Sequence, residues 1–320
     1  ESEHDTAKIN WLKAFISKIL PDSEIRIGHY RWRGYCLTGE TKSQHFLVNV
    51  GYSASNGKTT LSKMFLNAFP IYCQNITASC FDAGNTTGFN KAFSSLAHKS
   101  YRMIYMNEWG KKNQDTEKIK EVVEDDIIKC QPLFCNELDM RLQAKIESSS
   151  NNDPNIESKD NGVLRRGLRC EVTSQFIDKC DGPEDPVKHI YHKDPSINSL
   201  FDDTDYSLAL FHIYAPYAKV YYEEGLQVPD VWKTSFAAVL VDSDPWGDVF
   251  ENVTSVVGEY AYKEDILTMA RDVMNNNKLK WGSLLKEFKT RGFVYKSQQQ
   301  KTVNNKHIKG AFIDCHLEVD

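Results

Sequence analysis

The stretch VNVGYSASNGKTTL, residues 49–62, decides the fold class of this 320-residue chain. The short, apolar, β-branched run at residues 45–50 is typical of a buried strand. Residues 59–69 follow a helical pattern, with their apolar side chains on one face. A strand, a glycine-containing loop and the start of a helix, in this order, predict an α/β protein with a phosphate-binding loop.

The loop has the residue types that bind a nucleotide. Backbone N–H groups converge at the start of such a helix, where the helix dipole adds partial positive charge. We expect Lys58 to reach the terminal phosphates of ATP and the Thr59 hydroxyl to bind Mg²⁺. Five residues separate the two glycines, one more than in the usual P-loop, and Tyr52 stands where the first glycine normally falls. An ordinary βα turn is the alternative. The predicted nucleotide-binding residues are Gly51, Ser55, Asn56, Gly57, Lys58, Thr59 and Thr60.

Two further segments carry polar residues at the ends of predicted strands. Residues 101–109, YRMIYMNEW, have Asn107 and Glu108 near their end, and residues 131–139, QPLFCNELD, contain Asn136. Open α/β sheets bind ligands at the carboxyl ends of their strands. Glu108 is therefore the candidate to orient or deprotonate the attacking water and to help bind Mg²⁺. Asn136 is the candidate polar sensor of the γ-phosphate, although an asparagine after a strand is often only a turn former.

Paired arginines follow a polar segment. Residues 148–162, SSSNNDPNIESKDNG, predict a surface loop. Arg165 and Arg166 come next, before another predicted strand. They are either plain surface charge or candidates for an arginine finger that enters a neighbouring subunit's site, and the sequence does not choose between the two residues.

The order of these parts resembles the superfamily 3 helicases. More narrowly, it is similar to the helicase half of the primase-helicases of phages, plasmids and nucleocytoplasmic large DNA viruses, the pox- and asfarvirus type. The flanking segments, residues 20–40 and 225–250, are also similar to that family. The resemblance implies an AAA+-like P-loop ATPase core in a ring hexamer that uses ATP and Mg²⁺ to move along single-stranded DNA. Its implied catalytic residues are Lys58, Glu108, Asn136 and one of Arg165 and Arg166.

The chain departs from the family pattern in two more places. Asn107 stands where an acid can help to hold the metal. Only 27 residues separate Glu108 from Asn136, where the family usually has a basic channel hairpin. The hairpin is therefore either trimmed or partly missing from the sequence. Lys118, Lys120 and Lys129 are the remaining candidates for contact with DNA in the pore.

The C-terminal end is basic. Residues 278–309 hold eight Lys and one Arg against one acid, a charge of +8, although the whole chain has a net charge of −5. Helical patterns at 264–274 and 281–292, followed by two strands within 293–318, predict a winged-helix module. Either it binds DNA phosphates, or it docks a protein. The wing lysines proposed to contact DNA are Lys296, Lys301, Lys306 and Lys309.

These features divide the chain into a helical lead-in (1–44), the ATPase core (45–180), a helical segment (181–260) and the winged-helix-like domain (261–320). Residues 6–20 predict an amphipathic helix that packs on the chain's own core or on another subunit. Residues 206–225 predict a helix that is kinked or broken at Pro216. No segment is long and apolar enough to cross a membrane, and the polar start has no secretory leader. The eight scattered cysteines form no CxxC pair, as in a reduced compartment.

We therefore expect an ATP-dependent DNA helicase module that acts at the site of viral DNA replication, in the cytoplasm or nucleus of the host cell. Its expected partners are single-stranded or forked DNA, further copies of itself, other replication proteins and an upstream primase domain. One alternative is a DNA-binding initiation scaffold that uses ATP only to assemble its ring. Another is a small-molecule kinase, which would leave the basic C-terminal end unexplained.

Overall fold

The computed structural model divides the chain into two compact units, Glu1–Ser243 and Asp244–Asp320. The second unit therefore begins well before the boundary predicted at 260/261, and the predicted lead-in, 1–44, belongs to the first unit. The structure describes residues 3–51, 55–97, 99–109, 112–124, 126–132, 135–156, 161–200, 203–242, 246–274, 276–303 and 306–317.

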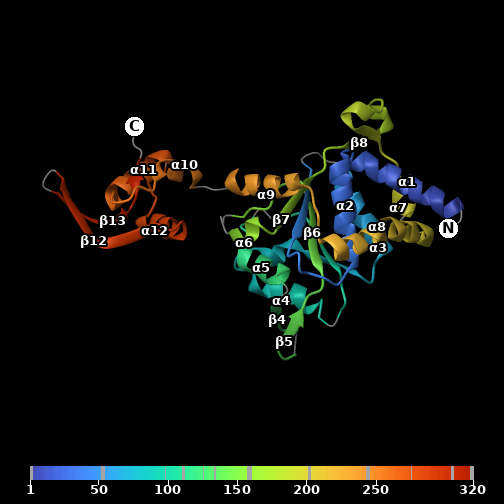
Figure 1. Cartoon of the computed structure of the whole chain (residues 1–320), viewed down its shortest axis with the longest axis horizontal. Coiled ribbons are helices and arrows are strands. Elements are labelled where there is room, and N and C mark those ends of the chain that lie inside the picture. The colour runs from blue at the N-terminus through green and yellow to red at the C-terminus, as the bar shows by residue number, and fades with distance from the viewer. Residues whose placement is uncertain are drawn as a thin grey trace. The chain divides into compact units, whose positions relative to one another are not determined.

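A five-stranded parallel sheet forms the centre of the N-terminal unit (Figure 1). The strand order is β2-β3-β6-β1-β7, so that β6 lies between β1 and β3. Val50 pairs with Ser150, and Asn107 pairs with Ser149, which brings the carboxyl ends of β1, β3 and β6 to one edge. The strands are β1 (Phe46–Val50), β2 (Cys73–Thr77), β3 (Met103–Asn107), β6 (Lys145–Ser150) and β7 (Gly167–Glu171).

Each face of the sheet has its own hydrophobic core because side chains alternate along a strand. On β1, Leu47 points to one core, whereas Phe46 and Val48 point to the other. Figure 1 shows the helices of the first core grouped together, apart from α4 and α5 of the second. The first core is covered by α1 (Glu3–Ile19), α2 (Ser23–Leu37), α3 (Lys58–Ala68) and α8 (Thr204–Glu224). The second contains η1 (Ala78–Phe81), α4 (Thr86–Ser94), α5 (Thr116–Val123) and residues of α6 (Asn161–Leu164) and α9 (Asp230–Asp242).

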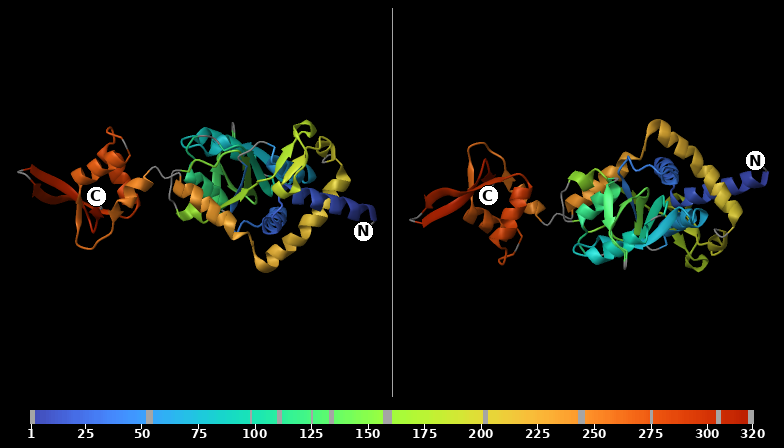
Figure 2. Two further views of the ribbon diagram at one scale, coloured as in Figure 1. Left: turned by 90° about the horizontal axis from the view of Figure 1, so that it is seen from above. Right: turned by 90° about the horizontal axis from the view of Figure 1, so that it is seen from below.

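The N-terminal helix packs on the chain's own core. Leu12, Ile16 and Ile19 of α1 are fully buried there, as the amphipathic pattern of residues 6–20 predicts. The long helix α8 also belongs to this core. It runs as one helix from Thr204 to Glu224 with Pro216 inside it, so the predicted break at Pro216 was wrong (Figure 2). Packing of its buried face against α1, α2 and α3 offsets the backbone hydrogen bond that proline removes.

A buried polar cluster joins these helices to the sheet. The Glu147 carboxylate of β6 is fully buried and accepts hydrogen bonds from Arg33 Nη2 (2.7 Å) and Trp32 Nε1 (2.8 Å) of α2. It also accepts from Ser62 Oγ of α3 (2.8 Å) and from Asn49 Nδ2 of β1 (3.1 Å). Burial alone would lower the pKa of Arg33, but the negative charge of Glu147 raises it. Arg33 therefore stays charged inside the protein.

Smaller elements surround the main sheet. β4 (Ile127–Cys130) and β5 (Leu138–Arg141) form an antiparallel pair between β3 and β6 in the sequence. β8 (Gln175–Ile177) and β9 (Ile190–His192) form a short parallel pair after β7. The connections after β8 contain η2 (Lys179–Asp181), η3 (Pro186–Lys188) and α7 (Ile197–Leu200).

The C-terminal unit has the predicted two helices followed by a long antiparallel pair of strands. Its three-stranded sheet has the order β11-β13-β12, and its core includes Ile266, Leu284, Phe288 and Phe312. The elements are α10 (Gly247–Glu251), β10 (Val253–Thr254), β11 (Tyr260–Tyr262), α11 (Lys263–Val273), α12 (Trp281–Thr290), β12 (Val294–Val303), β13 (Lys306–Ile313) and β14 (His316–Leu317). Asn304 and Asn305, predicted near the turn, lie outside the described residues.

In the described part of the chain, no helix combines the length and the apolar character needed to span a bilayer.

The Glu147 cluster generates a stability prediction. Arg33→Met should lower the free energy of unfolding of the N-terminal unit by about 3 kcal/mol, because it leaves a buried carboxylate without its cation. Chemical denaturation measures this shift. On the same helix, Arg31→Met removes a partly exposed ion pair with Glu224 and should cost less than about 1 kcal/mol. Equal effects of the two variants would contradict the role given to Arg33.

Candidate functional site

The loop between β1 and α3 has the geometry of an anion-binding turn. A Cβ atom at Gly51 would lie 1.6 Å from Nδ2 of the buried Asn56, so any side chain at position 51 would displace Asn56. Gly57 has φ 87° and caps α3 without a side-chain hydrogen bond. The first amides of a helix have no partner within the helix. Here the Lys58 N–H donates to Asn56 Oδ1 at 3.4 Å. The loop therefore places the positive end of α3, with glycine as its N-cap residue, beside the ends of the strands. Tyr52 lies outside the described residues.

Lys58, the first residue of α3, turns its ammonium group toward the ends of the strands. Its Nζ donates to Asn151 Oδ1 at 2.6 Å, to Gly51 O at 3.3 Å and to Asn56 Oδ1 at 3.4 Å. Burial lowers the pKa of Lys58, and the charge of Glu108 acts in the opposite direction. A cation held in this way is positioned to meet a phosphate oxygen.

Glu108 lies directly after β3, as predicted. Its backbone has φ 55°, a left-handed conformation that is uncommon outside glycine, and its N–H donates to Ser149 O at 2.9 Å. Asn151 Nδ2 donates to Glu108 Oε1 at 2.9 Å. Lys58, Asn151 and Glu108 thus form one continuous polar chain across the carboxyl ends of β1, β6 and β3.

The prediction for Asn136 was wrong about its place in the fold. Residues 131–139 are not a strand of the central sheet. Asn136 is exposed in the connection between β4 and β5. The strand between β1 and β3 is β6, and the asparagine that follows it is Asn151.

Residues 148–150, which the sequence predicted to begin a surface loop, are the buried end of β6. The strand KIESSS lacks an apolar pattern because its buried side chains, except that of Ile146, are polar. The available signal was the asparagine pair at 151–152 that follows this segment, which is comparable with Asn107 and Glu108 at the end of β3. The same error hid the hairpin, since β4 and β5 lie within the longer segment between Glu108 and Asn151.

The two arginine candidates have different environments. Arg166 is buried and bonded within its own unit, through an ion pair with Glu124 and a hydrogen bond to Gly162 O. Arg165 is exposed. Arg165 is therefore the one of the pair whose guanidinium faces away from its own core.

The predicted DNA-contacting lysines are scattered. Lys118 and Lys120 are partly buried on α5 and paired with Asp115 and Glu117. Lys129 is exposed on β4 and pairs with Glu137 across the hairpin at 3.3 Å. In the C-terminal unit, Lys296 and Lys309 are exposed, whereas the side chains of Lys301 and Lys306 lie outside the described residues.

The predicted metal-binding and loop residues lie at the start of α3. Thr59 and Thr60 occupy its first turn and are partly exposed, and Ser55 is exposed with φ 59°. The Thr59 hydroxyl and the Glu108 carboxylate are oxygen ligands of the kind that Mg²⁺ prefers. Among the described residues there is no cluster of three or more His, Cys, Asp or Glu side chains that could hold a metal by themselves.

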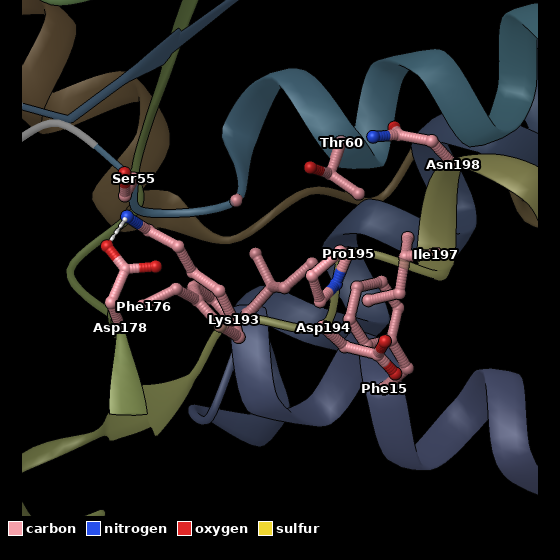
Figure 3. Close-up of a pocket in the computed structure, with 12 residues that line it drawn as sticks. Phe15, Ser55, Thr60, Phe176, Asp178, Lys193, Asp194, Pro195, Ile197 and Asn198 are labelled. Atoms are coloured by element: carbon pink, nitrogen blue, oxygen red, sulfur yellow. Dashed lines mark hydrogen bonds and ion pairs between the residues drawn. The ribbon is translucent and has the colours of Figure 1, made fainter. Parts of the chain in front are cut away.

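A cavity of about 360 Å³ adjoins the start of α3 (Figure 3). Phe15 of α1 and Phe176 of β8 give it aromatic walls, and Ser55 and Gly57 of the loop between β1 and α3 also line it. Lys193 Nζ donates to Asp178 Oδ2 at 2.8 Å at its margin. Sequence reasoning missed these residues because they come from separate segments that only the fold brings together.

Comparisons with known proteins give a likeness of fold. No family model matches the chain, and no curated protein matches it in sequence. Solved structures similar to it include two apo structures of the C-terminal region of NrS-1. One is an A form that is 13% identical, with 94% of this chain and 74% of that chain covered, at a TM-score of 0.55. The other is 12% identical, with 96% and 75% covered, at a TM-score of 0.55. The chain thus shares its overall fold with the C-terminal region of NrS-1 over nearly its whole length.

Proposed function

We propose that the chain is an ATP-dependent DNA helicase module of the primase-helicase kind, with an AAA+-like P-loop core. The observation that carries this proposal is the polar chain Lys58–Asn151–Glu108 beside the start of α3, whose N-cap residue is Gly57. It supplies a cation for the phosphates, an amide for a sensor and a carboxylate for the attacking water, the parts that phosphoryl transfer to water requires. The motif order and the likeness of fold support the same assignment.

Asn151 takes the sensor role in this proposal, in place of Asn136. Its amide lies between the phosphate-binding lysine and the acid, where it can hydrogen-bond both the γ-phosphate and the water. Mg²⁺ would be held by Thr59, the phosphates and water, with Glu108 nearby. It would supply positive charge against the charge that develops in the transition state.

The cavity beside α3 is the place for the nucleoside. It adjoins Gly57, so a nucleotide with its phosphates on the loop can extend its base between Phe15 and Phe176. Aromatic walls favour the flat apolar faces of a base. The volume of about 360 Å³ is in the range of small-molecule sites.

The β4–β5 hairpin is the proposed contact with DNA in the ring. The resemblance to superfamily 3 helicases implies a channel hairpin between the acid and the sensor, and β4–β5 lies between Glu108 and Asn151. Its Lys129 is exposed, and a phosphate could replace the surface ion pair with Glu137 at little cost. Lys118 and Lys120 are less suitable, because both are partly buried.

The proposed assembly is a homo-oligomer, a hexamer by resemblance, in which Arg165 reaches the neighbouring subunit's nucleotide. Arg165 is exposed, whereas Arg166 is tied to Glu124. The winged-helix-like C-terminal unit and an upstream primase domain complete the proposed replication enzyme. Particle imaging with a non-hydrolysable ATP analogue and a forked DNA tests the ring and its pore together. A ring that assembles with ATP but never separates strands would favour the scaffold alternative.

Lys58→Ala should lower ATP hydrolysis by roughly 10²-fold or more, because it removes the cation that faces the phosphates. Steady-state phosphate release measures the loss. Lys63→Ala changes an exposed lysine of the same helix and should leave the rate as it is. Normal turnover by Lys58→Ala would refute the phosphate loop.

Asn151→Ala should lower kcat by about 10²-fold with little change in KM, since the amide acts on the reacting phosphate. Asn136→Ala should keep the parent's rate in the absence of DNA, because Asn136 is exposed on the hairpin. If the two variants exchanged these results, the sensor would be Asn136 after all.

Arg165→Ala should keep ATP binding but lose turnover by about 10³-fold, the usual scale for an arginine finger. Mixing Arg165→Ala with Lys58→Ala should restore part of the activity, because a Lys58→Ala subunit lends its intact Arg165 to a neighbour. Arg166→Ala should instead lower the stability of the fold. A mixture with no more activity than its separate components would argue against action in trans.

A further inference from the structure

We propose that the exposed face of α12 in the C-terminal unit docks on double-stranded DNA. The inference rests on the proposed function for its context and adds to it the kind of DNA that this unit recognises. The first support is the segregation of charge. Within residues 244–320, the stretch 278–309 holds nine basic residues and one acidic residue. The rest of the unit holds two basic and ten acidic residues. The unit is thus nearly neutral in total but carries its positive charge on α12 and the neighbouring strands.

The outward face of α12 consists of small, hydroxyl-bearing and basic residues. Leu284 and Phe288 hold the opposite face in the core, where Phe288 stacks on Phe312 at 4.6 Å. The exposed residues are Gly282, Ser283, Lys286, Lys289 and Thr290. No carboxylate interrupts this face, so nothing on it repels a polyanion.

The lysines of this face are available for a partner. Within the described residues, Lys286 and Lys289 make no ion pair, nor do Lys278 and Lys280 just before the helix. The acid of α12, Glu287, is engaged with Arg291 at 2.7 Å. Arg291 itself lies 3.8 Å over the ring of Phe250 and belongs to the core rather than to the face. The free cations therefore gather on one side of the helix.

The shape of this face selects a duplex over a single strand. Ten residues of helix extend about 15 Å, and the major groove of DNA, roughly 12 Å wide, admits one helix. A Cβ atom at Gly282 would meet nothing within 4 Å. Because glycine has no side chain, no side chain projects from the helix at this position, and its backbone can approach base edges. Lysines on either side of this glycine can reach the phosphates at the edges of the groove. A single strand offers charge but no groove.

Fluorescence anisotropy with a blunt duplex and a single strand of equal length, measured over a range of salt concentrations, tests the inference on the full chain. For Lys286→Gln/Lys289→Gln, the negative slope of log affinity against log salt concentration for the duplex should become smaller in magnitude by about 2, because two phosphate contacts are lost. The slope for the single strand should stay unchanged. Lys13→Gln/Lys63→Gln, two exposed lysines of the other unit, is the matched control and should change neither slope.

A second variant separates groove docking from simple charge attraction. Gly282→Leu adds a side chain where the fold has open space and improves helix propensity, so it should fold. It should weaken duplex binding at least tenfold while leaving the salt slope intact, because no charge is lost. Parent-like duplex affinity of Gly282→Leu would overturn groove docking.

Equal losses of duplex and single-strand binding in the double lysine variant would also overturn the inference, in favour of a general polyanion surface. Polyglutamate serves as a probe for an acidic protein partner. If the double lysine variant lost binding to polyglutamate but kept duplex binding, the inference would be overturned in favour of an acidic protein. The ATPase proposal is judged separately, by Lys58→Ala, so either proposal can fail without the other.

Discussion

The buried carboxylate of Glu147 is the constraint on which the site depends. Taking an ion pair out of water costs several kcal/mol per charge, and only good geometry with further hydrogen bonds offsets this cost. Glu147 receives four donors, from α2, β1 and α3. Each donor can reach it only when its own element is in place. The helix that begins with Lys58 and the strand that ends beside Asn151 are therefore fixed relative to each other by one charged group beneath the site.

This constraint also explains what the sequence could and could not predict. The strand and helix on either side of the loop at 51–57, the strand before Glu108, and the two helices and hairpin of the C-terminal unit follow local patterns of apolar residues. The structure confirms the places of these elements. β6 does not follow such a pattern. Its buried residues include Lys145, Glu147 and three serines. All but Ser150 form hydrogen bonds with segments that are distant in the sequence, whereas Ser150 Oγ accepts from the nearby Asn152 N–H. A strand stabilised by long-range polar contacts carries no periodic signal of its own.

The two adjacent arginines also show that local sequence pattern does not determine burial. Arg165 and Arg166 are equivalent in any pattern of residue types, yet one is exposed and the other is buried against Glu124 of the α5 segment. Which of two neighbours faces inward depends on the turn that precedes β7 and on what packs across it. The cavity walls pose the same difficulty, because Phe15 and Phe176 are far apart in the sequence and have ordinary local contexts. Such sites are properties of the fold, whereas the loop between β1 and α3 is one continuous segment of the sequence.

Asn151 couples the two ends of the site through a single amide. Its Oδ1 accepts from Lys58 and its Nδ2 donates to Glu108, so the cation and the anion together fix the orientation of the amide. Under the proposed function, a triphosphate competes for Lys58, because hydrogen bonds between two charged groups are stronger than those to a neutral amide. When Lys58 turns to the phosphate, Asn151 loses the contact that holds its oxygen, and the amide can rotate toward the γ-phosphate. The hydrogen bond to Glu108 then breaks, and the carboxylate becomes free to bind water only after the nucleotide has arrived.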